Sequence, residues 1–199
     1  MAFVLILLAA YCIGSIPSAL WVGKLFYNKD IRQEGSGNLG TTNTFRVLGK
    51  SAGIVVLLMD ILKGTAAVLL VHIPYFAAVD IHPLLLGVIA VIGHMYPIFA
   101  GFRGGKAVAT SAGVVLGYAP LVFITLALLF VIILKMCKMV SLTSMSIAAI
   151  AFVYSVVSYF YTGDWVFTVM ITMLVAFIFY RHRENIARIK NGTESKVNF

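Results

Sequence analysis

The sequence has few charged side chains: Asp, Glu, Lys and Arg make up 11% of its 199 residues, whereas hydrophobic residues make up 61%. A soluble domain usually carries about 25% charged residues. This shortage, with a mean hydropathy of +1.02, excludes a soluble globular protein and indicates an integral membrane protein. The apolar stretches are long and continuous rather than alternating, which favours helices over a β-barrel.

Cysteine and acidic residues are also scarce, with two cysteines and seven aspartates and glutamates in the whole chain. Cys12 and Cys137 lie far apart and show no metal-ligand spacing, so we expect neither a disulfide nor a metal site. No pair of carboxylates is spaced for acid–base hydrolysis. We therefore expect an activity that needs no metal ion and no cofactor.

The basic residues give a net charge of +8, but they lie between apolar stretches and form no soluble domain. Membrane topology explains them better than nucleic-acid binding does. No charged side chain precedes Lys24, so residues 2–23 lack the basic region of a signal peptide and are expected to form a retained first span. Glycine and proline at residues 14–18 are expected to break this span.

The rest of the chain alternates between apolar segments and short polar ones. The further apolar segments are residues 52–72, 84–100, 107–134, 140–160 and 165–180. Residues 107–134 form either one long helix or two helices broken near Pro120. If they cross the membrane once, Lys135 and Lys138 lie on the opposite side of the membrane from Lys106. If they cross twice, every basic segment lies on one side, and the positive-inside rule favours this second arrangement.

The second arrangement predicts an all-α integral membrane protein with seven membrane-embedded helices, some of them short or broken. It places the N-terminus outside and the C-terminus in the cytoplasm, with residues 1–199 as a single polytopic membrane domain. The helix at 107–117 is too short to span a bilayer alone, so it must pack against protein or line a cavity. The chain after Lys190 is expected to be a short frayed end.

The most polar segment, GSGNLGTTNTFR at residues 35–46, follows the first span. Glycines let the backbone turn its N–H groups inward, and small polar side chains add donors. A helix starting at Thr41 or Thr42 would point its free N–H groups into the same concavity. The candidate ligand contacts are Gly35, Ser36, Gly37, Asn38, Gly40, Thr42, Asn43 and Arg46. Because no strand precedes GSGNLG, a dinucleotide motif is excluded, and the pattern favours an oxyanion site, most simply for phosphate.

A second glycine-rich basic turn, FRGGK at residues 102–106, follows the third predicted span. Gly104 and Gly105, with Arg103 and Lys106, favour a second anion site at the start of the next helix. The turn is not a P-loop, because Ala107 stands where a P-loop has Ser or Thr.

The end of the last span, RHRENIAR at residues 181–188, carries more than the Lys and Arg that a membrane anchor needs. On a helix, His182 and Asn185 share one face, where they could hydrogen-bond the same ligand oxygen. Asp60 and Lys63 lie one turn apart inside a predicted span, where we favour a structural ion pair over direct substrate contact. His94 by itself is typical of a packing histidine.

Taken together, three segments resemble the three signature regions of the bacterial acyl-phosphate:glycerol-3-phosphate acyltransferases. They are SGNLGTTNTFR at 36–46, GHMYP at 93–97 with FRGGK at 102–106, and RHRENI at 181–186. The resemblance covers nearly the whole chain. Three positions depart from the family's usual sequence: Thr41 replaces alanine, Arg103 replaces lysine and keeps its charge, and Ala107 replaces glycine.

The resemblance implies transfer of a fatty acyl group from acyl phosphate to the 1-hydroxyl of sn-glycerol 3-phosphate, which gives lysophosphatidic acid for phospholipid synthesis. It implies a multi-pass protein of the bacterial cell membrane with its active site facing the cytoplasm. We expect this protein to be a monomer. A soluble enzyme that produces acyl phosphate is a possible partner. By matching position, the residues that bind and react are Ser36, Arg46, Lys106, His182 and Asn185. His94, within the second signature region, is a further candidate contact, and Glu184 and the glycines shape the site.

The residues leave two chemical questions open. The proton of the attacking hydroxyl goes either to His182 or to the departing phosphate, and we favour the phosphate. Ser36 could instead act first as a nucleophile.

A transporter of a phosphorylated solute is the main alternative function, because broken helices also build transport sites. The polar segments, however, all lie on the predicted cytoplasmic face of the membrane. Transport would also need a polar path to the external face. The account predicts that Ser36, Arg46, Lys106 and Asn185 converge on one cationic pocket.

Overall fold

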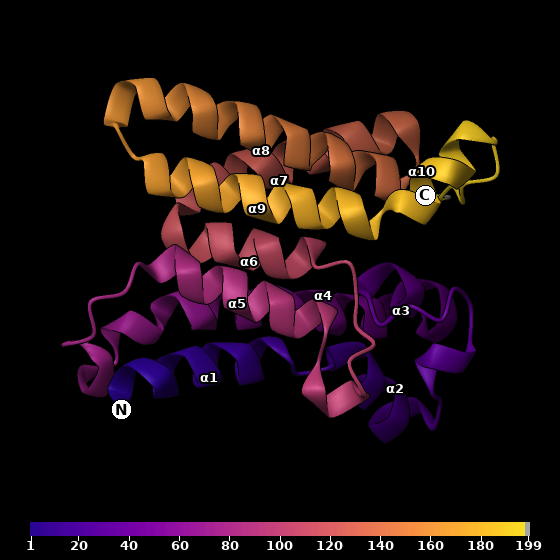
Figure 1. Cartoon of the computed structure of the whole chain (residues 1–199). Coiled ribbons are helices and arrows are strands. Elements are labelled where there is room, and N and C mark those ends of the chain that lie inside the picture. The colour runs from indigo at the N-terminus through magenta and orange to yellow at the C-terminus, as the bar shows by residue number, and fades with distance from the viewer. Residues whose placement is uncertain (198–199) are drawn as a thin grey trace. The chain divides into compact units, whose positions relative to one another are not determined.

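The structure is a computed structural model that describes residues 1–197, and in that range it contains helices and no β-strand (Figure 1). The predicted all-α class is therefore confirmed. The α-helices are α1 (Ala2–Gly14), α2 (Ser18–Tyr27), α3 (Thr41–Leu48), α4 (Lys50–Leu69), α5 (Pro83–Met95), α6 (Val108–Tyr118), α7 (Pro120–Cys137), α8 (Val140–Thr162), α9 (Trp165–Arg181) and α10 (Arg183–Lys190). Short 3-10 helices are η1 (Ile31–Gln33), η2 (Leu70–His72), η3 (Pro74–Phe76) and η4 (Ile98–Ala100).

Four helical segments are long and apolar enough to cross a membrane. They are Lys50–His72, Pro83–Ala100, Pro120–Cys137 and Val140–Thr162. Two bent pairs raise the number of candidate spans among the described residues to as many as six: α1 with α2, bent by 48°, and α9 with α10, bent by 56°. An integral membrane protein is thus supported by helix length and composition.

The breaks in the helices follow proline and glycine. The first predicted span is interrupted between Gly14 and Ser18, because Pro17 cannot continue the backbone ladder of α1. Residues 107–134 form two helices, as the distribution of basic residues favours, and Pro120 begins the second of them. Pro120 takes the first helical position, where its missing N–H group costs nothing.

The chain divides into two compact units, residues 1–119 and residues 120–199. In the first unit, α1 packs on α5, and α4 packs on α3, α5 and α6 (Figure 1). The helices α4 and α6 approach closely: a Cβ on Gly64 would meet the Thr110 carbonyl, and one on Gly113 would meet the Ile61 carbonyl. In a lipid bilayer the hydrophobic effect does not drive helices together. Small residues at such crossings let the helices approach closely enough to pack by van der Waals contact.

An apolar cluster in the first unit anchors the polar segment that follows α2. Leu39 lies within residues 35–46, yet it is buried with Ile31, Leu48 and Val56. This burial pins the middle of a glycine-rich loop to α3 and α4.

The second unit is built on antiparallel helices, with α8 packed against both α7 and α9 (Figure 1). Gly163 is the C-cap of α8 and Asp164 is the N-cap of α9, where its carboxylate accepts the N–H of Phe167 at 2.9 Å. The C-terminal helix α10 follows α9 after the bend at His182.

Candidate active site

The loop before α3 is held from the inside by Asn43. The buried Asn43 amide accepts the Ser36 N–H at 2.9 Å and donates to the Glu34 carbonyl at 3.1 Å. Gly35 has φ +59°, and a Cβ there would collide with the Asn43 amide oxygen. Only glycine therefore fits this turn without strain. The amide of Asn43 is thus occupied by the loop's own backbone, which fixes the loop's shape.

The helix predicted to start at Thr41 or Thr42 starts at Thr41. Thr44 closes its first turn, with its N–H 3.1 Å and its hydroxyl 3.2 Å from the Gly40 carbonyl. Ser36, Thr42 and Arg46 are exposed. The loop therefore presents the Ser36 hydroxyl to solvent close to the N-terminus of α3, where anions are favoured, whereas the Arg46 guanidinium comes from the last turn of that helix.

Two side-chain atoms of this segment are buried and have no hydrogen-bond partner among the described residues: Asn38 Oδ1 and Thr41 Oγ1. Buried polar atoms in native proteins are nearly always paired, so an unpaired one needs an explanation. A bound ligand that carries a hydroxyl group as well as phosphoryl oxygens would supply both partners, because the hydroxyl group would donate to Asn38 Oδ1 and a phosphoryl oxygen would accept from the Thr41 hydroxyl.

Upstream of the loop, Asp30 caps η1 and pairs with Arg32. Its carboxylate accepts the Arg32 N–H at 3.1 Å and lies 2.6 Å from Arg32 Nη2. Hydrogen bonding to Arg32 holds the pKa of Asp30 well below its ordinary value of 3.8, against the opposing effect of burial. Asp30 is therefore ionised at neutral pH, and it fixes the start of the loop.

The second glycine-rich turn folds back on the end of α5. The N–H of Gly104 donates to the Met95 carbonyl at 3.1 Å, and that of Gly105 donates to the His94 carbonyl at 3.2 Å. A Cβ on Gly105 would meet the His94 ring and would lie 3.1 Å from the Leu39 carbonyl. The two glycine-rich loops of the first unit therefore meet beside His94.

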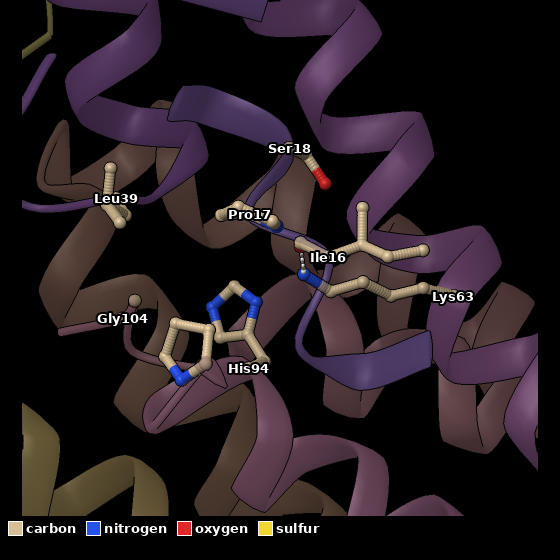
Figure 2. Close-up of a pocket in the computed structure, with 9 residues that line it drawn as sticks. Ile16, Pro17, Ser18, Leu39, Lys63, His94 and Gly104 are labelled. Carbon is tan, nitrogen blue, oxygen red and sulfur yellow. Dashed lines mark hydrogen bonds between the residues drawn. The ribbon is translucent and has the colours of Figure 1, made fainter. Parts of the chain in front are cut away.

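A small cavity of about 10 Å³ lies beside this junction, lined in part by Leu39, Lys63, His94, Gly104 and Gly105. Figure 2 shows the side chains of Lys63 and His94 lying close together around it. The cavity is smaller than the roughly 300–1,000 Å³ of usual small-molecule sites. It is thus a small space beneath the loops rather than the whole substrate site.

The ion pair predicted inside the second span is present. Lys63 Nζ lies 2.8 Å from Asp60 Oδ1. It also donates to the Ile16 carbonyl at 2.8 Å (Figure 2). Asp60 also accepts the Ser18 hydroxyl at 2.8 Å, and His94 Nδ1 lies 3.8 Å from it. The pair thus ties α4 to the break between α1 and α2 and to the first residue of α2.

The cations of the second turn differ in exposure, because Arg103 is exposed whereas Lys106 is half-buried directly before α6. Ala107, one of the three departures from the family's usual sequence, is buried and has φ +62°. Its backbone takes the left-handed conformation that glycine adopts without strain.

In the second unit, His182 and Asn185 lie at the start of α10, and both are buried. The His182 Nδ1 atom is 2.8 Å from the Ile178 carbonyl. Because a carbonyl only accepts, Nδ1 carries the proton, and Nε2 is then the basic nitrogen of the neutral ring. Glu184 is exposed.

The chain after Lys190 is not the frayed end that its sequence predicted. Glu194 turns back, and its carboxylate accepts from Ser141 Oγ at 2.6 Å, Asn185 Nδ2 at 2.6 Å and Arg188 Nε at 2.7 Å. A polar sequence close to a chain end gives no signal of this contact, because it depends on where α8 and α10 place their side chains.

The candidate residues thus fall into two groups, one in each unit. In the first unit, Asn43 shapes the first loop, and that loop meets Gly105 and His94. In the second unit, His182 and Asn185 lie on the first turn of α10. The first group is Gly35, Ser36, Gly37, Asn38, Gly40, Thr42, Asn43, Arg46, His94, Arg103, Gly104, Gly105 and Lys106. The second is His182, Glu184 and Asn185.

These features define a helical membrane protein with glycine-rich loops suited to oxyanions. A family model described as glycerol-3-phosphate acyltransferase matches residues 4–192. Among curated relatives, the glycerol-3-phosphate acyltransferase of Enterococcus faecalis is 58% identical over 206 residues, covering 100% of this chain and 94% of the relative. The one of Geobacillus kaustophilus is 57% identical over 193 residues, covering 97% and 95%. The chain belongs to the glycerol-3-phosphate acyltransferase family.

Solved structures agree with this assignment. The crystal structure of PlsY (YgiH), an integral membrane glycerol 3-phosphate acyltransferase, in its glycerol 3-phosphate form is similar with a TM-score of 0.87 and 37% identity, covering 100% of this chain and 96% of that one. Its lysophosphatidic acid form gives a TM-score of 0.85 and 36% identity, with the same coverage. The sequence-based prediction of an acyltransferase of bacterial membranes is confirmed.

Proposed function

We propose that this protein transfers a fatty acyl group from acyl phosphate to the 1-hydroxyl of sn-glycerol 3-phosphate, and so forms lysophosphatidic acid. The observation that carries the proposal is the pair of buried atoms without a partner in the first glycine-rich loop, Asn38 Oδ1 and Thr41 Oγ1. The relative solved in glycerol 3-phosphate and lysophosphatidic acid forms supports the same acceptor and product.

Both substrates carry a phosphate, so the protein must offset two multiply charged anions. The exposed guanidinium of Arg46 can bind a phosphate through two parallel hydrogen bonds. Lys106 adds a point charge at the start of α6, and Arg103 adds another cation before it. Ser36 and the loop N–H groups supply donors toward oxygens that gain charge in the transition state.

The reaction needs no covalent enzyme intermediate, because acyl phosphate is already activated. The 1-hydroxyl oxygen attacks the acyl carbon, the bond from that carbon to the phosphate oxygen breaks, and the hydroxyl proton passes to the departing phosphate. Holding the two reactants together supplies much of the rate. His182 and Asn185 bind the glycerol hydroxyls.

The proton route predicts the behaviour of a His182→Gln variant. An essential general base contributes about 10²- to 10⁴-fold to the rate. If phosphate takes the proton, the variant loses only a hydrogen bond, and kcat falls by about tenfold or less. A loss above about hundredfold would make His182 the base instead.

The membrane arrangement belongs to the same proposal. We infer seven membrane-embedded helices in one polytopic domain, with the N-terminus outside and the catalytic residues and the C-terminus on the cytoplasmic side. The distribution of Lys and Arg supports this orientation. The protein acts as a monomer, and a soluble enzyme supplies its acyl phosphate.

The test uses purified protein in detergent with glycerol 3-phosphate and either acyl phosphate or acyl-CoA. We expect lysophosphatidic acid from acyl phosphate and none above background from acyl-CoA. Equal rates from acyl-CoA would contradict the proposed donor. Uptake of glycerol 3-phosphate into liposomes without a donor would favour a transporter.

A further inference from the structure

Asp60 and Lys63 form a buried ion pair that no step of the proposed chemistry uses. Their side chains are 2% and 5% exposed, and both lie within the candidate span Lys50–His72. A buried ion pair is weak evidence of a gain in stability, because the cost of taking two charges out of water can exceed their attraction. A charged side chain inside a membrane span is by default a sign of a functional site. The pair therefore requires an explanation beyond stability.

The partners of the pair lie where the first predicted span breaks. Lys63 Nζ donates to the Ile16 carbonyl at 2.8 Å, and Asp60 Oδ1 accepts the Ser18 hydroxyl at 2.8 Å. Pro17 stands between these two partners and has no N–H group with which to continue the backbone ladder of α1. The two hydrogen bonds therefore fix the break on α4, and they set the direction in which α2 leaves it.

The helix α2 carries one wall of the first glycine-rich loop. Its residues Leu20 and Val22 belong to the buried apolar cluster that holds Leu39 of that loop. The cluster also includes Val56, which lies one helical turn before Asp60 on α4. A change in the direction of α2 would therefore move this wall, and the first loop would move with it.

The second glycine-rich turn lies beside the same pair. The cavity of about 10 Å³ next to Lys63 is also lined by Leu39 of the first loop and by Gly104 and Gly105 of the second turn. Figure 2 shows Lys63 and Ile16 on one side of this cavity, and Leu39 and Gly104 on the other. A cavity of this size has room for about one water molecule. The pair and the two glycine-rich loops are therefore close neighbours.

Each loop holds its own shape through contacts that do not involve the pair. In the first loop the Asn43 amide accepts the Ser36 N–H at 2.9 Å, and in the second the Gly104 N–H donates to the Met95 carbonyl at 3.1 Å. Loss of the pair should therefore leave each loop intact and change the distance between them. A reaction between two bound substrates depends on that distance, because a misplacement of about 1 Å costs about a hundredfold in rate.

We propose that Asp60 and Lys63 are positioning residues for acyl transfer: they fix the break between α1 and α2 on α4, and so set the spacing of the two glycine-rich loops and of the substrates bound there. This inference rests on the proposed function, with one substrate phosphate at each loop. Neither side chain has to touch a substrate. A pair with only a structural role would stabilise the fold without setting the rate of the reaction.

The first test compares the purified wild type with Ser18→Ala, which removes one contact at the break and no charge. Thermal unfolding in the same detergent shows whether each protein is folded at the assay temperature. We expect kcat to fall about fivefold, the usual effect of one hydrogen bond. The KM for glycerol 3-phosphate and that for the acyl donor should each stay within about twofold. An unchanged kcat, or a higher KM at normal kcat, would overturn the proposal.

A double variant, Asp60→Val with Lys63→Met, separates positioning from stability. It leaves no unpaired charge in the interior, so its Tm should lie above that of Lys63→Met alone. The contacts with Ile16 and Ser18 are both lost, so kcat should stay about tenfold to a hundredfold below the wild type. A kcat that recovers together with Tm would show that the pair is only structural. Ser18→Ala decides the question if the double variant does not fold.

Thr65→Val is the matched control on the same helix. Thr65 Oγ1 donates to the Gly113 carbonyl at 2.9 Å, so valine removes a hydrogen bond between α4 and α6 that does not reach the break. It should lower Tm and keep kcat within about twofold. The ratios are taken with whichever acyl donor the wild type uses. Failure of the proposed function then appears as no product from acyl phosphate with the wild type. A fall in kcat in Thr65→Val as large as in Ser18→Ala would contradict the positioning role.

Discussion

Gly104 is the position at which one added methyl group tests the arrangement of the loops most sharply. A Cβ there would collide with the His94 carbonyl and would lie 2.7 Å from both the Met95 carbonyl oxygen and Pro97 Cδ. Two of these contacts are with backbone oxygens, which cannot rotate away as a flexible side chain can. The Gly104→Ala variant must therefore move the whole turn before Lys106.

The size of the effect follows from this geometry. Restoring ordinary contacts requires a movement of roughly 1 Å, and overpacking of this kind costs about 1–3 kcal/mol of stability. If Lys106 binds a reacting phosphate, a 1 Å displacement of its turn lowers kcat/KM by about a hundredfold. The value of kcat/KM should therefore fall by more than the smaller amount of folded protein can explain.

Gly101→Ala in the same turn is the matched control. Gly101 has φ +64°, so alanine there is strained by about 1 kcal/mol, but a Cβ would meet no atom within 4 Å. Both variants are assayed for lysophosphatidic acid and for thermal unfolding. The reasoning fails if Gly104→Ala keeps kcat/KM within twofold of Gly101→Ala.

Three further predictions follow from single contacts. Lys63→Met strips the buried Asp60 of its cation and should cost about 3–5 kcal/mol, seen as a lower Tm; an unchanged Tm would contradict the buried pair. Ala107→Gly relieves a left-handed backbone and should raise stability by about 0.5–1 kcal/mol, whereas a lower Tm would show that the methyl group contributes more than the strain costs. Asn38→Ala removes a buried acceptor without a partner, so it should raise the KM for glycerol 3-phosphate about tenfold and leave Tm unchanged; a lower Tm at normal KM would make Asn38 structural.

Much of the fold follows from local signals in the sequence. Pro17 marks the first break and Pro120 the start of a helix, while the glycines before Thr41 place the beginning of α3. These features depend on backbone chemistry that each residue carries by itself. The distribution of basic residues correctly favoured two helices within residues 107–134.

What the sequence could not show depends on contacts between distant segments. The anchoring of a polar loop by Leu39 requires the apolar cluster of α3 and α4. The bend of 56° between α9 and α10 has no proline to mark it. From the sequence, Glu194 was expected to lie in a frayed end. The sequence gives no sign of its contacts, because the donors that hold its carboxylate come from α8 and α10.

Asn43 shows where a prediction from residue type stops. The amide of Asn43 was expected to contact substrate, whereas in the structure it holds the Ser36 and Glu34 backbone. A polar residue in a glycine-rich loop can hydrogen-bond either a ligand or the backbone of the loop itself. Only the hydrogen bonds seen in the structure distinguish these two roles.

The most direct test of the central claim, that the first glycine-rich loop binds the phosphate of glycerol 3-phosphate, is a calorimetric titration without any acyl donor. The account predicts saturable binding to wild-type protein, weakened at least about tenfold in Arg46→Ala because a charge-assisted pair is lost. Lys50→Ala, which removes an exposed cation four residues further along, should bind like the wild type. Equal binding by all three proteins would contradict the claim.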